Sequence, residues 1–138
     1  MRYLARREHS RAELHRKLQP HAEDEAELEA VLDDLERRNW LSDARTAAQL
    51  IEYKRTRFGT RRIVHELRQK GIAEELISVS LPGLKEGELD AAREAWRKKF
   101  AELPQNDKEK ARQIRFLQAR GFSLEIIFRL LKLADTGD

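Results

Sequence analysis

The sequence predicts an all-α protein, built as an elongated, curved array of three tandem three-helix repeats with about nine helices. Three observations lead to this prediction. Apolar residues recur at helical spacing, and no segment shows the period-two alternation of a β-strand. Similar segments recur about every 50 residues. Apolar residues make up 40% of the chain and charged residues 38%, so most of the folded molecule must be surface, and we expect it to be thin.

The repeat is clearest in three short segments with the same apolar spacing. Residues 63–72 (IVHELRQKGI) match residues 113–122 (QIRFLQARGF) at a constant offset of 50, and residues 14–18 (LHRKL) match IVHEL at an offset of 49. Each segment is the expected second helix of its unit, and such a period is typical of helical repeat arrays. Each unit alone has few large apolar residues, so the units must stack. We divide the chain into residues 1–39, 40–84 and 85–138.

The first unit is expected to hold an opening helix around Tyr3 and Leu4, and two further helices. Ser10 and Glu13 have the spacing of a capping box, which starts a short second helix that Pro20 ends. The third helix begins near Glu23, where acidic residues complement the helix dipole. The inward positions of the second and third helices are predicted to be Leu14, Leu18, Leu28, Val31, Leu32 and Leu35.

The second unit begins at Ser42, a good N-cap. Gly59 is expected to end its first helix and Thr60 to cap the second. Gly71 stands where a left-handed residue commonly ends a helix. The third helix starts at Glu74 and Glu75, and Pro82-Gly83 is expected to stop it. The predicted inward positions of this unit are Ala44, Ala47, Ala48, Ile51, Phe58, Ile63, Leu67, Leu76, Ile77, Val79 and Leu81.

The third unit is expected to start with a helix over residues 86–101. Asn106 and Glu109 repeat the capping-box spacing before a basic helix that Gly121 ends. A closing helix runs from Ser123 to Ala134. The predicted inward positions are Leu89, Ala92, Ala95, Trp96, Phe100, Ala111, Ile114, Leu117, Ile126, Ile127, Leu130 and Leu131.

Composition argues against catalysis and export. The chain has no cysteine, which excludes disulfides, thiolate metal sites and thiol nucleophiles. Its four histidines lack metal-ligand spacing, its glycines form no phosphate-binding loop, and its acidic pairs are adjacent in sequence and diverge on a helix. No apolar run approaches the length of a membrane span. We therefore expect a soluble cytoplasmic protein, monomeric, that is not an enzyme and needs no cofactor or metal.

The strongest functional signal is the alternation of charge. Residues 54–70 carry seven Lys/Arg against one acid, whereas residues 21–38 carry two against eight. On the helix after Gly59, Arg61, His65 and Arg68 share a stripe opposite the apolar face. A solvated face with ion pairs such as Arg62–Glu66 also fits the pattern, but so many cations without local partners favour a binding surface. The candidate partner-binding residues are Arg6, Arg7, Arg11, Arg16, Lys17, Arg55, Arg57, Arg61, Arg62, Arg68, Lys70, Arg112, Arg115 and Arg120.

Charge alone leaves the partner open. Nucleic-acid phosphates and an acidic protein groove both fit clustered Arg and Lys. The second helices lack the Asn/Gln/Ser/Arg mixture that favours base readout, so sequence-specific DNA recognition is disfavoured. The aromatic residues lie mostly on apolar stripes, where packing in the core is a more natural role than base stacking.

Four motifs, in order and with matching spacing, resemble the bacterial RecX regulatory proteins. They are residues 4–18 (LARREHSRAELHRKL), 41–45 (LSDAR), 58–72 (FGTRRIVHELRQKGI) and 115–122 (RFLQARGF). Thr46 stands where the family usually has an aromatic residue. The family's pattern carries over to Arg6, Arg7, Ser10, Leu14, Lys17, Leu18, Asp43, Gly59, Arg62, Ile63, Glu66, Leu67, Lys70, Gly71, Phe116, Leu117, Arg120 and Gly121.

The resemblance implies a fold and a partner. It implies an elongated, curved array of three-helix repeats, in agreement with the period of the sequence. It also implies a non-enzymatic regulator that binds the recombinase RecA and its filaments on single-stranded DNA. Such proteins usually limit filament growth, ATP hydrolysis, strand exchange and coprotease activity in the damage response.

Overall fold

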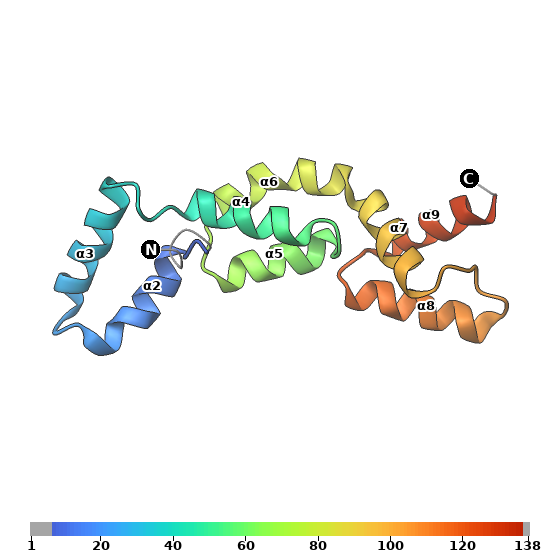
Figure 1. Ribbon diagram of the computed structural model, residues 1–138, viewed down its shortest axis with the longest axis horizontal. Coiled ribbons are helices and arrows are strands. Elements are labelled where there is room, and N and C mark those ends of the chain that lie inside the picture. Colours follow the sequence, from blue (N-terminus) through green and yellow to red (C-terminus); the bar gives the residue numbers. More distant parts are fainter. Residues whose placement is uncertain (1–6, 137–138) are drawn as a thin grey trace.

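The computed structural model describes residues 7–136, and within them all the regular elements are helices, with no strand. The expected opening helix at Tyr3 and Leu4 falls outside the described residues. The molecule is long and narrow, with its helices arranged in succession along one axis (Figure 1). The predicted all-α array is therefore confirmed. The helices are α2 Arg11–Leu18, α3 Glu25–Arg37, α4 Asp43–Lys54, α5 Thr60–Gln69, α6 Glu74–Glu86, α7 Glu88–Lys99, α8 Asp107–Ala119 and α9 Leu124–Asp135, with a 3₁₀ turn at Gln19–His21.

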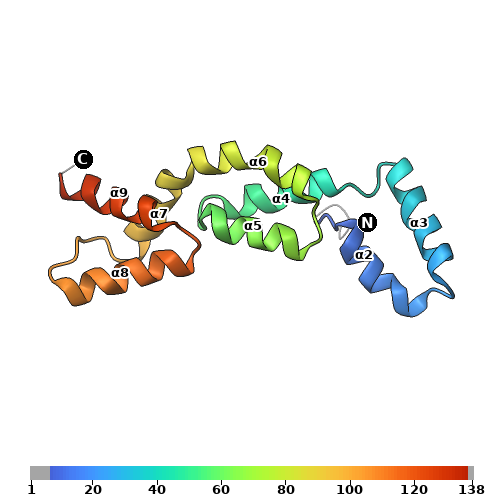
Figure 2. The same ribbon diagram turned by 180° about the vertical axis from the view of Figure 1, so that it is seen from behind.

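The second helices of the three units, α2, α5 and α8, lie end to end along one side of the molecule. Figures 1 and 2 both show them along the lower edge, whereas α4, α6 and the end of α9 lie above them. The three helices run in the same sense, so the end of α8 meets the start of α5 and the end of α5 meets the start of α2.

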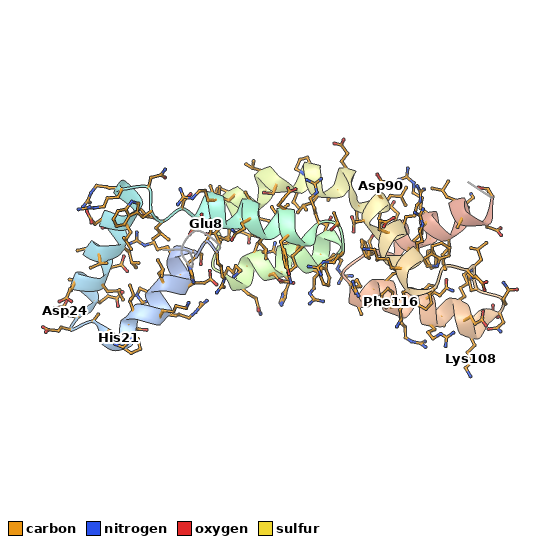
Figure 3. The ribbon with its side chains drawn as sticks, viewed as in Figure 1. Glu8, His21, Asp24, Asp90, Lys108 and Phe116 are labelled. Atoms are coloured by element: carbon orange, nitrogen blue, oxygen red, sulfur yellow. The ribbon has the colours of Figure 1, made fainter. Side chains whose placement is uncertain are left out.

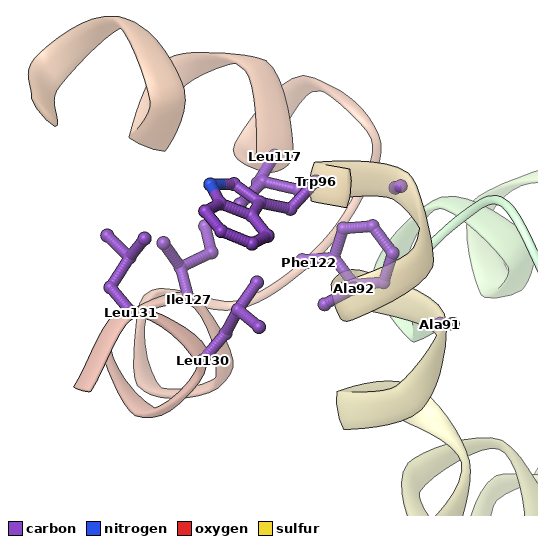
Figure 4. Close-up of a cluster of buried hydrophobic side chains, with 9 residues drawn as sticks. Ala91, Ala92, Trp96, Leu117, Phe122, Ile127, Leu130 and Leu131 are labelled. Carbon is purple, nitrogen blue, oxygen red and sulfur yellow. The ribbon is translucent and has the colours of Figure 1, made fainter. Parts of the chain in front are cut away.

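The buried apolar residues form three clusters in succession along the chain. Leu28 and Leu32 of the first unit form the first cluster together with Leu41, which comes just after the expected boundary, and residues from Ala47 to Leu84 form the second. The third surrounds the Trp96 ring with side chains of α8 and α9, as Figure 4 shows. The Trp96 indole N–H donates to Gln113 Oε1 at 2.8 Å, which satisfies the polar atom that this ring brings into the core.

The predicted inward stripes need five corrections. Val31, Ala44, Ala48, Val79 and Ala111 are exposed. The exposed fraction reaches 79% for Val79. Thr46 and Gln113 are buried instead, since each finds a hydrogen-bond partner: the Thr46 hydroxyl donates to the Ser42 carbonyl. Apolar character alone does not decide these positions, because at the edge of a helix contact the neighbouring helices determine which residue is covered.

Helix starts follow the predicted caps in most cases. The reciprocal capping box of Ser10 and Glu13 is present, and Ser42 caps α4. Asn106 caps α8, but the Glu109 carboxylate accepts from the Gln105 N–H in place of the N-cap N–H. Gly59, not Thr60, is the N-cap of α5.

Two predicted helix ends were wrong. α4 stops at Lys54, before Gly59. α6 continues through Pro82 and Gly83 to Glu86. Proline removes one backbone hydrogen bond from a helix interior, yet Ile77 and Leu84 on either side are buried in the second core, and this tertiary packing outweighs the local cost.

Successive units meet through very close backbone contacts at the ends of the second helices. The Gly59 N–H donates to the Arg120 carbonyl at 2.8 Å. A Cβ atom on Gly59 would lie 2.3 Å from the Gly121 carbonyl oxygen, and one on Gly121 would lie 2.4 Å from Arg62 Cβ. Only glycine fits at both positions, so this junction joins α8 to α5 with no side chain between them.

The junction of the first and second units repeats this arrangement. The Ser10 hydroxyl donates to the Lys70 carbonyl, and a Cβ atom on Gly71 would lie 2.5 Å from Ala12 Cβ. Lys70 and Arg120 are the C-caps of α5 and α8, and Ser10 and Gly59 are the N-caps of α2 and α5. In both junctions a carbonyl at the negative end of one helix therefore accepts from a donor at the positive end of the next.

We predict that Gly121→Ala destabilises the protein by on the order of 1–3 kcal/mol, because Gly121 has φ of 93° and its added Cβ would meet Arg62. The matched control is Gly83→Ala. Gly83 lies inside α6 with nothing within 4 Å of an added Cβ, so alanine there should stabilise by roughly 0.5–1 kcal/mol. Thermal unfolding followed by circular dichroism measures both. Equal shifts for the two variants would contradict a tight junction.

A second prediction concerns Glu13, whose carboxylate receives the Lys70 ammonium across the first junction at 2.8 Å. Burial acts to raise the pKa of Glu13, but hydrogen bonds from Lys70 and Ser10 outweigh it and lower the pKa below its ordinary value. Because the pKa of Glu13 is lower in the folded state than in the unfolded state, its ionised carboxylate stabilises the folded protein. This contribution is fully present at pH values above the ordinary pKa of the carboxyl. It is lost as the pH falls through the lower, folded-state pKa. Glu13→Gln should therefore be less stable than the parent at pH 7, and the difference should shrink on acidification below about pH 4.5. Urea unfolding at a series of pH values measures it, and a constant difference would refute the role of this carboxylate.

Candidate partner-binding surface

The outward faces of α2, α5 and α8 carry exposed Lys and Arg residues in each unit, and we call this side of the molecule the basic edge. Arg16, His65 and Arg115 occupy equivalent repeat positions, at offsets of 49 and 50, and all three are exposed. Figure 3 shows side chains projecting from this edge, with Lys108 at its far end on α8. The end-to-end junctions place these positions on successive units of one side. The exposed Lys and Arg residues of the basic edge are Arg16, Lys17, Arg61, Arg62, Arg68, Lys108, Arg112 and Arg115.

In the first unit, acidic side chains already occupy much of the predicted surface. Arg11 pairs with Glu29, Asp33 and Glu36 of α3. Burial acts to lower the pKa of Arg11, but its hydrogen bonds to Glu29 and Asp33 raise it above the ordinary value for arginine. Arg7 and Lys70 share Glu13, and Arg6 falls outside the described residues. Arg16 and Lys17 are exposed and make no ion pair with any described carboxylate.

In the second unit the cations are only partly paired. Arg62 bonds to Glu66 one turn further along α5, and Arg68 bonds to Glu74 at the start of α6. Both arginines remain well exposed, and such surface pairs contribute little to stability and exchange easily for other anions. Arg61 is exposed and has no ion pair within residues 7–136. Arg55 lies away from the basic edge, beside Gly87 at the turn between α6 and α7.

Where the second and third units meet, the structure gathers cations around the ring of Phe58. We call this group the junction cluster. The distances from the ring centroid are 5.0 Å to Lys54 Nζ, and 5.9, 4.6 and 5.1 Å to the Cζ atoms of Arg57, Arg62 and Arg120. Arg120 also lies 5.0 Å from the ring of Phe116, which is labelled in Figure 3. Cation–π contacts hold these side chains in place without adding a negative charge.

A single carboxylate, Glu66, pairs with the junction cluster among the described residues. Burial acts to raise the pKa of Glu66, but hydrogen bonds from Lys54 and Arg62 lower it below its ordinary value, so this group is anionic near neutral pH. One negative charge cannot balance Lys54, Arg57, Arg62 and Arg120, and the cluster keeps a strong positive potential.

Sequence reasoning missed part of this cluster. Lys54 of α4 was not among the candidates. Neither was Lys99 of α7, which lies outside the cluster, 5.7 Å from the Phe116 ring. The signal that could have found Lys54 is Phe58 itself, an aromatic residue surrounded in sequence by Lys54, Arg57 and Arg62. The structure also brings His15 together with Glu25 and Glu29 of α3, with 2.6 Å between His15 Nε2 and Glu25 Oε2. Spacing along the chain could not reveal a group that two helices share.

The hydrogen bond from His15 lowers the pKa of Glu25 below its ordinary value.

The described helices include none that combines the length and apolar character needed to cross a bilayer.

The fold defines an all-α protein built from three-helix repeats. Comparison with known proteins identifies the family. The family models for the first, second and third three-helix domains of RecX match residues 1–35, 42–81 and 86–131. This chain belongs to the RecX family of regulatory proteins.

Individual relatives agree with this assignment. The chain is 50% identical over 135 residues to the regulatory protein RecX of Leptothrix cholodnii, covering 98% of this chain and 86% of the relative. It is 48% identical over 128 residues to RecX of Chromobacterium violaceum, covering 93% and 83% of the two chains. The crystal structure of RecX from Lactobacillus salivarius shares the fold, with a TM-score of 0.79 at 18% identity, over 98% of this chain and 91% of that one.

Proposed function

We propose that this protein is a non-enzymatic regulator that binds the recombinase RecA and its filaments on single-stranded DNA, and limits their ATPase, recombinase and coprotease activities. Membership of the RecX family supports the choice of partner. The observation that carries the proposed mode of binding is the end-to-end alignment of α2, α5 and α8, which repeats an exposed cation on each unit. A repeating surface suits a repeating target.

In this mechanism the basic edge lies along a groove of the filament in the cytoplasm. Cations of successive units contact acidic protein surface, and DNA phosphates where these are accessible, on neighbouring RecA protomers. The free energy of binding comes from many modest, salt-sensitive contacts, so no cofactor or metal is needed. The protein acts as a monomer in this mechanism. By bridging several RecA protomers, the protein alters the addition of protomers to the filament and the ATP hydrolysis that accompanies filament assembly.

The alternative is a general nucleic-acid-binding helical repeat without specificity for a recombinase. The junction cluster favours this alternative specifically, because its cations surround aromatic rings as in sites that bind DNA without sequence preference. Binding to DNA measured over a salt series, with and without RecA, separates the two functions. A RecA regulator should bind the filament more tightly than bare DNA at the same salt concentration.

We predict that Arg112→Glu with Arg115→Glu weakens inhibition of the DNA-dependent ATPase of RecA by at least about tenfold in the concentration needed, because both side chains are exposed on the basic edge without ion pairs in the described chain. The matched control is Lys98→Glu with Arg129→Glu, the same charge change at two exposed cations of α7 and α9 that form no ion pair in the described chain, and it should inhibit nearly as the parent does. Equal loss in both variants would mean that net charge, not the basic edge, matters. Activation of the ATPase by the parent protein would reverse the proposed direction of regulation.

A further inference from the structure

The first unit differs from the other two in the number of carboxylates that its third helix, α3, places beside its second helix, α2. α3 presents four carboxylates toward α2, and we call them the acidic stripe: Glu25, Glu29, Asp33 and Glu36. By contrast, α6 gives α5 a single carboxylate, Glu74, and α9 makes no ion pair with α8 among residues 7–136.

The acidic stripe holds more negative charge than its partners require. Arg11 lies 2.7 Å from Glu29, 2.8 Å from Asp33 and 2.5 Å from Glu36, so three carboxylates surround one guanidinium. The stripe members are three or four residues apart on one helix, a spacing at which like charges repel. An arrangement that served stability alone would use fewer acids.

The surplus charge lies beside the basic edge. Arg11 is one turn before His15, and Arg16 and Lys17 follow on the same short helix. The carboxylates therefore bond directly to Arg11 and His15. They also lower the positive potential at Arg16 and Lys17, which lie within about one Debye length of the stripe.

These contacts can exchange without unfolding. Glu29, Asp33 and Glu36 are between 43% and 56% exposed, whereas Leu28 and Leu32 hold α3 to the unit from its buried side. A partner's anionic groups could replace the stripe at Arg11 while the helices stay packed.

We propose that the acidic stripe is an autoinhibitory contact, an internal substitute for the anionic partner that competes for the α2 part of the basic edge. The inference rests on the proposed function for the identity of that partner. It makes the first unit the weakly binding end of the molecule and the third unit the open end, with engagement of α2 requiring displacement of the stripe.

The test compares two variants of α3 and its leading turn. Glu29→Gln with Glu36→Gln leaves Arg11 a single carboxylate, Asp33. The matched control, Glu23→Gln with Glu27→Gln, makes the same change in net charge at two exposed acids of the same unit that form no ion pair within the described chain. Circular dichroism and thermal unfolding check that both fold as the parent does. The probe is a fluorescein-labelled single-stranded oligothymidylate, followed by anisotropy over a salt series.

We expect the stripe variant to bind severalfold more tightly than the control, and its plot of log affinity against log salt to steepen by about 0.7 for each cation released to a phosphate. Adding Arg11→Gln to the stripe variant should remove most of this gain. Equal affinity in the stripe variant and the control would overturn the autoinhibitory contact, since only net charge would then matter.

The same variants with RecA filaments distinguish this inference from the proposed function. If the parent protein leaves the RecA ATPase unchanged while the stripe variant still outperforms its control on DNA, the proposed function fails and the autoinhibitory contact stands. If the parent inhibits RecA and the stripe variant and control match on both probes, the contact fails and the proposed function stands.

Discussion

The architecture depends on the near-touching backbones where one second helix ends and the next begins. Gly59 and Gly121 approach so closely that neither can carry a side chain, and the Ser10 hydroxyl and Lys70 carbonyl repeat the contact one unit away. These junctions fix both the spacing of the units and their rotation about the long axis. Without them the three amphipathic helices would still form, but their cations would not share a side. The alignment of charge is thus a consequence of two glycine contacts and one serine hydroxyl.

The extent to which acidic side chains pair with the cations of the basic edge differs from unit to unit, because the third helices carry different numbers of carboxylates near the second helices. α3 surrounds Arg11 with carboxylates, α6 supplies only Glu74 to Arg68, and the cations of α8 have no described acidic partner. The mean charge of the chain, +3, hides this gradient. Cations that pack against aromatic rings, as at Phe58, keep a positive potential around them, whereas cations that pair with carboxylates lose much of it. At the junction of the second and third units, four cations around Phe58 share one paired carboxylate, Glu66, among the described residues.

Much of the fold could be predicted from the sequence, because helical periodicity, caps and an internal period near 50 are local signals. Gly71 is predicted from the sequence as a left-handed helix end and Gly121 as a helix end, and both have positive φ. The continuation of α6 through Pro82 could not be predicted, since burial of Leu84 beyond it is a tertiary effect. The same holds for the surface: Arg61 and Arg115 were found from charge alone, but the capture of Arg11 by α3 and the place of Lys54 and Lys99 beside aromatic rings depend on contacts between helices.

The central claim is that one side of the molecule, running across all three units, meets the filament. The natural absence of cysteine allows a direct measurement with single thiols. Gln69→Cys on α5 and Gln118→Cys on α8 report on the basic edge, and Ser78→Cys on α6 reports on the opposite side; all three positions are exposed. The account predicts that RecA filaments slow maleimide labelling of both edge thiols and leave the α6 thiol unaffected. Protection of the α6 thiol with free labelling of the edge thiols would contradict it.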